Sequence, residues 1–165
     1  MIITKETQNK ITTWKNEQGS IYSIIPPPEE YCFNFFLPET EKSNILQLGS
    51  CGNTFRFLLK QIYPNTKLTD VDIEDYSEFS DNFVLCDARD FIKNTSQIFD
   101  YSVVDLATTQ NVCEFIFEKE FQENLKKISY EGVINAGNYE NKFSYLNCIK
   151  SIKSMSNNLI FWRNK

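Results

Sequence analysis

An apolar run that ends in a turn of short residues is the part of the chain best suited to bind a ligand. Residues 45–48 form the run, and Gly49, Ser50 and Gly52 lie in the turn. Glycine has no Cβ, so the backbone can turn tightly and a ligand can approach the main chain. From Thr54 onward the pattern predicts a helix whose first amides point toward that ligand. The segment therefore predicts a strand, a turn and a helix that together build a nucleotide pocket.

Three carboxylates lie at the ends of successive expected strands. Asp72 lies about twenty residues beyond the turn, where nucleotide-binding folds place the partner of a ribose. Asp87 and Asp105 end the next two runs along the chain. Because the carboxyl ends of parallel strands meet at one edge of a sheet, all three acids are expected near Gly49.

Each of these features also has a simpler interpretation. The glycines could shape a turn that binds nothing, and Asp72 could belong to a solvated acidic loop. Asp87 suits the N-cap of the helix that follows it, and Asp105 could brace the next loop.

The elements that would position the acids alternate between strand and helix. The expected strands are 45–48, 68–73, 83–86, 101–106, 132–136 and 158–162. The expected helices are 54–63, 88–92, 118–128 and 142–155. Such alternation predicts an α/β fold with a truncated, Rossmann-like, doubly wound and mostly parallel sheet, whose ligands bind beyond the carboxyl ends of the strands.

The region before this alternation has a different pattern. Residues 10–25 contain two alternating runs around a glycine, which predict a β-hairpin, and three prolines then interrupt regular structure. We expect residues 1–28 to form this hairpin and its connector, and residues 29–165 to form a nucleoside-binding domain that opens with a short helix within 29–37.

Composition narrows the classes of function. The 165 residues are 41% hydrophobic, enough for one domain with a core. The formal net charge of -5, with no basic cluster, argues against a nucleic-acid partner. No apolar run reaches the length of about 18 residues that a membrane span needs, and the N-terminus soon turns polar. We therefore expect a cytoplasmic protein without a membrane partner.

The cysteines and the missing histidines limit the chemistry further. Five cysteines form no CxxC pair and are odd in number, which favours reduced, buried thiols over disulfides or a zinc site. The chain has no histidine. Acid–base chemistry must therefore use carboxylates, tyrosine or lysine, and no metal is expected.

As a set, these segments resemble the S-adenosylmethionine-type Rossmann domain, and more closely the spermidine synthases and related polyamine aminopropyltransferases. The resemblance covers residues 44–138 and rests on segments 45–54, 71–74, 86–92, 101–105 and 117–121. It implies that Gly49, Ser50 and Gly52 shape the donor site and that Asp72 holds the ribose hydroxyls.

The same resemblance implies roles for the later segments. Asp87 and Ala88 would face the adenine, and Asp105 would be the catalytic acid that positions an amine and accepts its proton. The donor would be an S-adenosylmethionine-type nucleoside in decarboxylated form, used as a co-substrate rather than a tightly bound cofactor, and the acceptor a polyamine. Thr108 and Tyr31 are candidate contacts to that acceptor, although packing is the simpler role for Tyr31.

The chain also departs from this family in several places. The family has a second acid where Thr108 stands, and its N-terminal β-domain is reduced here to the hairpin. Residues 74–83 have room for only about one helical turn, so one wall of the adenosine pocket is expected to be missing. No sequence is left for the final antiparallel strand.

Two other functions therefore stay open beside aminopropyl transfer. The chain could be a degenerate member of the fold that binds a nucleoside without turnover, or it could be a small-molecule methyltransferase. The apolar strand at 158–162 has nothing after it to pair with its outer edge, so we also expect a homo-oligomer, most simply a symmetric dimer.

Overall fold

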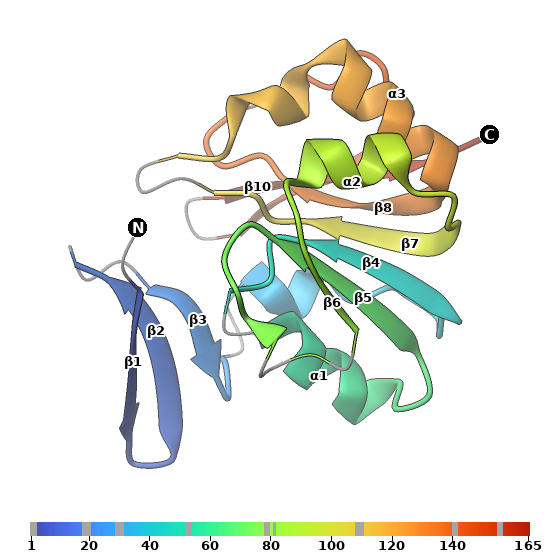
Figure 1. Cartoon of the computed structure of the whole chain (residues 1–165). Helices are drawn as coiled ribbons and strands as arrows, with labels where there is room; N and C mark the ends of the chain where they lie inside the picture. The colour runs from blue at the N-terminus through green and yellow to red at the C-terminus, as the bar shows by residue number, and fades with distance from the viewer. Residues whose placement is uncertain are drawn as a thin grey trace.

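The structure is a computed structural model of the whole chain and describes residues 3–17, 21–28, 32–51, 54–77, 80, 82–107, 111–139, 142–154 and 157–165. It contains two sheets (Figure 1). The smaller sheet consists of β1 (Ile3–Gln8), β2 (Ile11–Asn16) and β3 (Ile21–Ile25). The larger sheet consists of β4 (Asn44–Leu48), β5 (Lys67–Asp72), β6 (Phe83–Leu85), β7 (Phe99–Val104), β8 (Ser129–Asn135), β9 (Cys148–Ser154) and β10 (Asn157–Arg163).

The helical elements connect these strands. They are η1 (Cys32–Phe35), α1 (Thr54–Ile62), α2 (Ala88–Asn94), η4 (Glu114–Phe117) and α3 (Lys119–Ile128). Within the described part of the chain, no helix is both long and apolar enough to cross a membrane.

The strand order of the larger sheet is β6-β5-β4-β7-β8-β10-β9. The first five strands in this order are mutually parallel, and β10 runs antiparallel to both of its neighbours. The chain moves outward from β4 to β6 and then returns to the other side of β4 with β7. This reversal leaves a crevice beyond the carboxyl ends of β4 and β7, the usual ligand site of such sheets. The predicted α/β, mostly parallel fold is confirmed.

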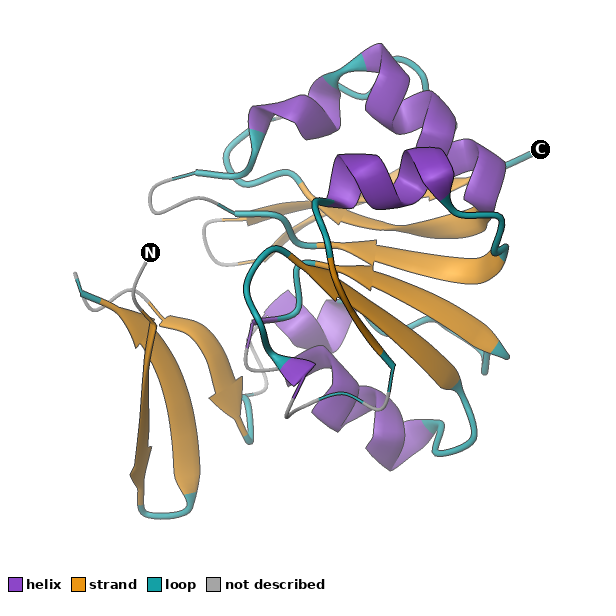
Figure 2. Ribbon diagram, in the orientation of Figure 1, coloured by secondary structure: helices purple, strands orange, loops and turns teal. Residues whose placement is uncertain are grey.

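Both faces of the sheet are covered, as Figure 2 shows. Neighbouring strand residues point to opposite faces, so Ile45 joins the core under α1 and η1, while Leu46 joins the core under α2 and α3. On β8, Val133 joins the core under α1 and η1, and Ile134 joins the core under α2 and α3. The central strands are therefore buried on both sides, and their buried residues include the polar side chains Gln47, Thr69, Asp70 and Ser102 as well as apolar ones.

The predicted helix at 142–155 is wrong. Residues 142–147 contain no helix, and β9 follows as a strand paired with β10, with Ile152 opposite Leu159. The apolar positions Phe143, Leu146, Ile149 and Ile152 are three residues apart, which imitates a helical period. Pairing with β10 overrides that local pattern. The expectation that no sequence remains for a final antiparallel strand is therefore also wrong, because β10 is an antiparallel strand of this sheet.

This hairpin removes the reason for expecting a dimer. The outer side of β10 is not open, because β10 lies between β8 and β9. The edge strand on this side of the sheet is β9, on which Lys150 and Lys153 are exposed. Lysines on an edge strand discourage pairing with another chain.

The N-terminal hairpin is confirmed for β2 and β3, which pair antiparallel. The sequence did not predict β1, because the described side chains of Thr4–Gln8 are all exposed and show no apolar alternation. The backbone of β1 pairs with β2 along its whole length. The short helix expected within 29–37 is reduced to η1, and residues 29–31 lie outside the described residues.

Thr54 ties the smaller sheet to α1. Its buried hydroxyl hydrogen-bonds Ser23 Oγ and accepts the Ile24 amide at 3.0 Å. We expect Thr54→Val to lower the free energy of unfolding by about 1–2 kcal/mol, because buried polar groups lose their partner. Urea unfolding measures this loss. Thr4→Val, which removes an exposed hydroxyl, is the control and should change it by less than about 0.5 kcal/mol; equal effects would contradict the proposed link.

Candidate functional site

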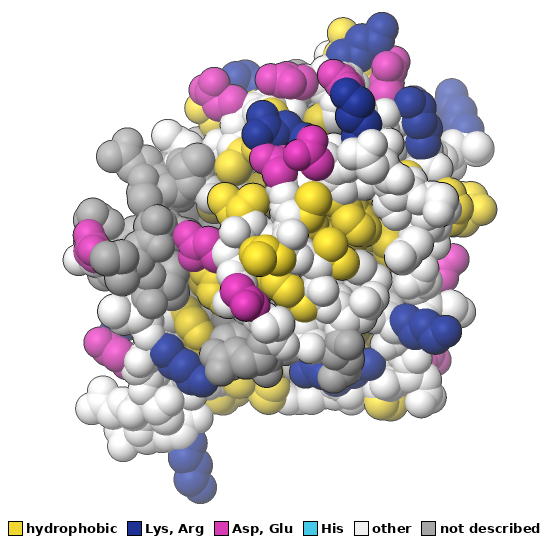
Figure 3. Space-filling model, viewed as in Figure 1, with side chains coloured by type: hydrophobic (Ala, Val, Ile, Leu, Met, Phe, Trp, Pro, Cys, Tyr) yellow, Lys and Arg dark blue, Asp and Glu magenta, His cyan; other side chains and the backbone are white. Residues whose placement is uncertain are grey.

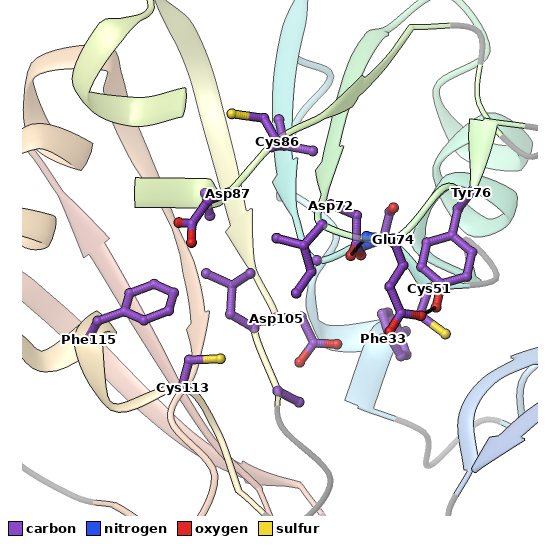
Figure 4. A pocket seen from close by; sticks show the side chains of 17 residues that line it. Phe33, Cys51, Asp72, Glu74, Tyr76, Cys86, Asp87, Asp105, Cys113 and Phe115 are labelled. Atoms are coloured by element: carbon purple, nitrogen blue, oxygen red, sulfur yellow. Dashed lines mark hydrogen bonds between the residues drawn. The ribbon is translucent and has the colours of Figure 1, made fainter. Parts of the chain in front are cut away.

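A cleft opens at the carboxyl ends of the parallel strands (Figure 4). The enclosed part of the cleft holds about 140 Å³, and the cleft opens to solvent. Its walls come from the turn after β4, the ends of β5 and β7, the start of α2, and η4. Asp72, Asp87 and Asp105 all line this cleft, so the structure brings the three predicted acids together.

Gly49 lets the turn after β4 pack directly against the end of β7. Its φ of +85° favours glycine, and a Cβ at this position would lie 2.3 Å from the Asp105 carbonyl oxygen. Gly49 N donates to the carbonyl of Val71 at 2.9 Å, which joins the turn to β5. Ser50 is buried in the same wall. Gly52, the other predicted glycine of the turn, lies outside the described residues.

Asp72 connects two loops of the cleft. Its Oδ2 accepts the Ser50 amide at 2.8 Å, and its Oδ1 accepts the Glu74 amide at 3.1 Å. Burial raises the pKa of Asp72, and these backbone hydrogen bonds oppose that rise. The bond from Ser50, which lies in a different loop, distinguishes Asp72 from a freely solvated loop carboxylate. Each oxygen can accept a second hydrogen bond, so Asp72 has the chemistry to bind a diol.

Tyr76 forms part of the cleft wall that the short segment 74–83 was expected to leave open. It lines the cleft, is 9% exposed and donates through its hydroxyl to Glu74 Oε2 at 2.8 Å. The neighbouring Cys51 thiol has its pKa raised to about 12, chiefly by burial, so it stays protonated. Tyr76 was not predicted as a site residue. The sequence marks it only as a single aromatic residue within an acidic segment.

Asp87 is the N-cap of α2, as its simpler interpretation predicts. Its Oδ1 accepts the Arg89 amide at 2.8 Å, and its Oδ2 lies 2.7 Å from Arg89 Nη2. This pairing lowers the pKa of Asp87. The guanidinium carbon of Arg89 lies 4.7 Å from the ring centre of Phe115, which also lines the cleft beside Ala88. An adenine at this position would have to share the Asp87 oxygens with Arg89.

Asp105 follows β7 and faces the cleft. Its Oδ1 accepts a hydrogen bond from Asn135 Nδ2 at 2.8 Å. Burial raises the pKa of Asp105 to about 6, with a further rise from the charge of Asp72 and an opposing effect of the Asn135 hydrogen bond. Sequence reasoning missed Asn135, although an asparagine at the carboxyl end of a central strand was its signal. Thr108 and Tyr31 lie outside the described residues.

The raised pKa predicts that Asp105 weakens the fold when it is ionised. A carboxyl group whose pKa is higher in the folded than in the unfolded state costs stability above the folded value. Asp105→Asn should therefore raise the free energy of unfolding by about 1–2 kcal/mol at pH 8, with the gain disappearing as the pH falls from 6 toward 4. Urea unfolding of both proteins at several pH values tests this. A gain that is constant with pH would contradict the raised pKa.

The cleft is anionic. Its described lining includes Asp72, Glu74, Asp87 and Asp105 but no lysine or arginine. The face drawn in Figure 3 likewise carries apolar and acidic side chains near its centre, with most lysines and arginines toward the periphery. In the part of the chain that the structure describes, no three Cys, Asp or Glu side chains gather as metal ligands. The arrangement suits a ligand with an apolar body and a positive charge.

Comparison with known proteins places the fold. The sequence matches no protein-family model, and no curated protein is significantly similar to it. Among solved structures, human methyltransferase-like protein 13 in complex with SAH is similar at a TM-score of 0.61 and 15% identity, over 76% of this chain and 73% of that one. The N-methyltransferase NodS from Bradyrhizobium japonicum WM9, in complex with S-adenosyl-L-homocysteine, gives 0.54 and 16%, over 74% and 78%. The fold is the Rossmann-like fold of these methyltransferases.

The fold does not identify the acceptor. The 16S rRNA methylase RmtB is also similar, at a TM-score of 0.56 and 10% identity over 81% of this chain and 60% of that one. One fold thus serves proteins named for different substrates, and the function of this chain has to be argued from its site. The resemblance to spermidine synthases stays a prediction.

Proposed function

We propose that this cleft binds an S-adenosylmethionine-type nucleoside and that the protein transfers an alkyl group from its sulfonium to an amine. The observation that carries the proposal is the meeting of Asp72 and Asp105 in one cleft at the reversal of strand order. In this proposal, the Asp72 carboxylate accepts hydrogen bonds from the two ribose hydroxyls. The Gly49 turn lets the nucleoside approach the backbone between the two carboxylates.

The charge of the cleft favours a donor without a carboxylate. A sulfonium is attracted by Asp72 and Asp105, whereas the carboxylate of intact S-adenosylmethionine would be repelled by them. Within the described lining no lysine or arginine offsets this repulsion. We therefore favour the decarboxylated donor, and hence aminopropyl transfer, over methyl transfer.

Asp105 is the proposed general base. The amine nitrogen attacks the carbon beside the sulfonium, the carbon–sulfur bond breaks, and methylthioadenosine leaves with the electron pair. Asp105 orients the amine and accepts the proton that the nitrogen loses. A pKa of about 6 keeps most of the Asp105 carboxyl ionised at neutral pH while leaving it basic enough to serve.

Nucleoside binding without turnover is the second candidate. It is favoured by the sequence, which has Thr108 where the spermidine synthases have a second acid. Turnover assays with putrescine and spermidine, under saturating decarboxylated donor, separate the two functions. Release of methylthioadenosine supports transfer, and binding without release supports the second candidate.

The ribose assignment predicts that Asp72→Ala weakens nucleoside affinity by about ten- to a hundredfold, the effect of losing one charge-assisted hydrogen bond. Calorimetric titration with methylthioadenosine measures the change. Asp75→Ala is the matched control, because Asp75 is exposed in the same acidic segment and does not line the cleft. Equal affinities for the wild type and Asp72→Ala would remove the ribose assignment.

A further inference from the structure

Asn135, at the carboxyl end of β8, holds one oxygen of Asp105. It is 7% exposed, and its Nδ2 donates to Asp105 Oδ1 at 2.8 Å. At the other end of the amide, Oδ1 accepts the Gly137 amide at 2.9 Å. Because the oxygen of the amide accepts and its nitrogen donates, the bond from Gly137 fixes which end of Asn135 faces Asp105.

Gly137 is in turn held by β10. Its carbonyl accepts from both the backbone N of Asn158, at 2.7 Å, and Asn158 Nδ2, at 2.9 Å. Gly137 has a φ of +56°, a conformation that favours glycine. A connected series of hydrogen bonds therefore runs from the antiparallel strand β10, through the turn after β8, to Asp105.

The two oxygens of Asp105 have different surroundings. Oδ1 is occupied by Asn135, whereas Oδ2 accepts no hydrogen bond from the part of the chain that the structure describes. An unrestrained carboxylate can rotate and present either oxygen to a substrate. A fixed one keeps a single orientation before the substrate arrives, which lowers the entropic cost of the reaction.

We propose that Asn135 is the positioning residue of Asp105, fixing Oδ1 so that Oδ2 is the oxygen that receives the proton from the acceptor. This inference rests on the proposed function. It deepens that function by assigning a role to a residue on a strand that carries none of the predicted site residues.

The groups around Asp105 indicate what loss of Asn135 would do. Among the described residues, Asp72 on β5 and Cys51 in the turn after β4 are the titratable groups that interact with Asp105. The charge of Asp72 raises the pKa of Asp105, and the Cys51 thiol is protonated. Asn135 is the side chain that opposes the rise. Without this donor, less of Asp105 should be ionised at neutral pH.

The test is a carbon-13 NMR titration of the Asp105 carboxyl in the full chain, without donor or acceptor. Asn135→Leu should raise the measured pKa by about one unit or more, the usual effect of removing a hydrogen bond to a carboxylate. Asn135→Ala, which cannot overpack, replaces it if the leucine variant does not fold. Because no ligand is present, the result is independent of whether the protein catalyses transfer.

Asn164→Leu is the matched control. Asn164 also donates two side-chain hydrogen bonds, to the carbonyls of Lys126 and Ser129 at 2.8 Å each, but it does not line the cleft. A shift in the Asn135 variants alone supports the positioning role. An unchanged pKa in a folded Asn135 variant overturns it, and so does an equal shift in Asn164→Leu, which would assign the effect to general loss of stability.

Discussion

Asp105→Asn should lower the rate of alkyl transfer by a factor of about a hundred or more, the usual effect of losing a general base. The asparagine keeps the size of the side chain and can still contact an amine, but it cannot accept a proton. Affinity for methylthioadenosine, which carries no sulfonium charge, should stay nearly unchanged, because the ribose is assigned to Asp72. Steady-state release of methylthioadenosine, with calorimetric titration of the same preparations, measures both quantities.

Asp100→Asn is the control for this experiment. Asp100 lies on the same strand, β7, but its carboxylate accepts the Asn44 amide at 3.0 Å and does not line the cleft. We expect Asp100→Asn to leave the transfer rate within about twofold of the wild type, because substitutions away from the cleft have small effects. Full activity of Asp105→Asn would contradict the proposed mechanism.

Gly49→Ala should both destabilise the protein and abolish most nucleoside binding. The new Cβ would lie 2.3 Å from the Asp105 carbonyl oxygen, on a residue whose φ is +85°. Backbone strain and overpacking each cost about 1–3 kcal/mol, so we expect a loss of about 3 kcal/mol or more. Separating β4 from β7 at this point also moves the turn away from Asp105, and affinity should fall at least about tenfold.

Gly132→Ala separates the two effects. Its Cβ would lie 2.2 Å from the Ser102 carbonyl oxygen, within the sheet and away from the cleft. It should cost similar stability through overpacking, while its folded fraction binds the nucleoside like the wild type. Urea unfolding and calorimetry at a temperature where both variants are folded provide the comparison. Equal losses of affinity would show that Gly49 acts only through stability.

Much of the fold could be predicted because the central strands carry local signals. The runs that become β4, β5 and β7 contain apolar residues such as Leu48, Val71 and Val104, and each has an acid or a glycine at its carboxyl end. Parallel pairing then brings those ends together, which is why Asp72, Asp87 and Asp105 were expected in one cleft. The rule that ligands bind at the reversal of strand order then predicts the position of the cleft.

The features that were missed depend on partners distant in sequence. The strand β9 has helix-like spacing and becomes a strand only through β10, while β1 has no apolar pattern and is held by its pairing with β2. Asn135 lies thirty residues from Asp105, and nothing local indicates that their side chains meet. The sequence predicted the capping role of Asp87. Its pairing with the Arg89 guanidinium is seen only in the structure.

The central claim is that the anionic cleft binds an S-adenosylmethionine-type nucleoside. Calorimetric titration of the wild-type protein with methylthioadenosine, S-adenosylmethionine and its decarboxylated form tests this claim most directly. We predict saturable binding at one site per chain, with the decarboxylated form binding more tightly than the intact one because it lacks the carboxylate that Asp72 and Asp105 repel. No binding of any of the three, at concentrations up to about 1 mM, would contradict the claim.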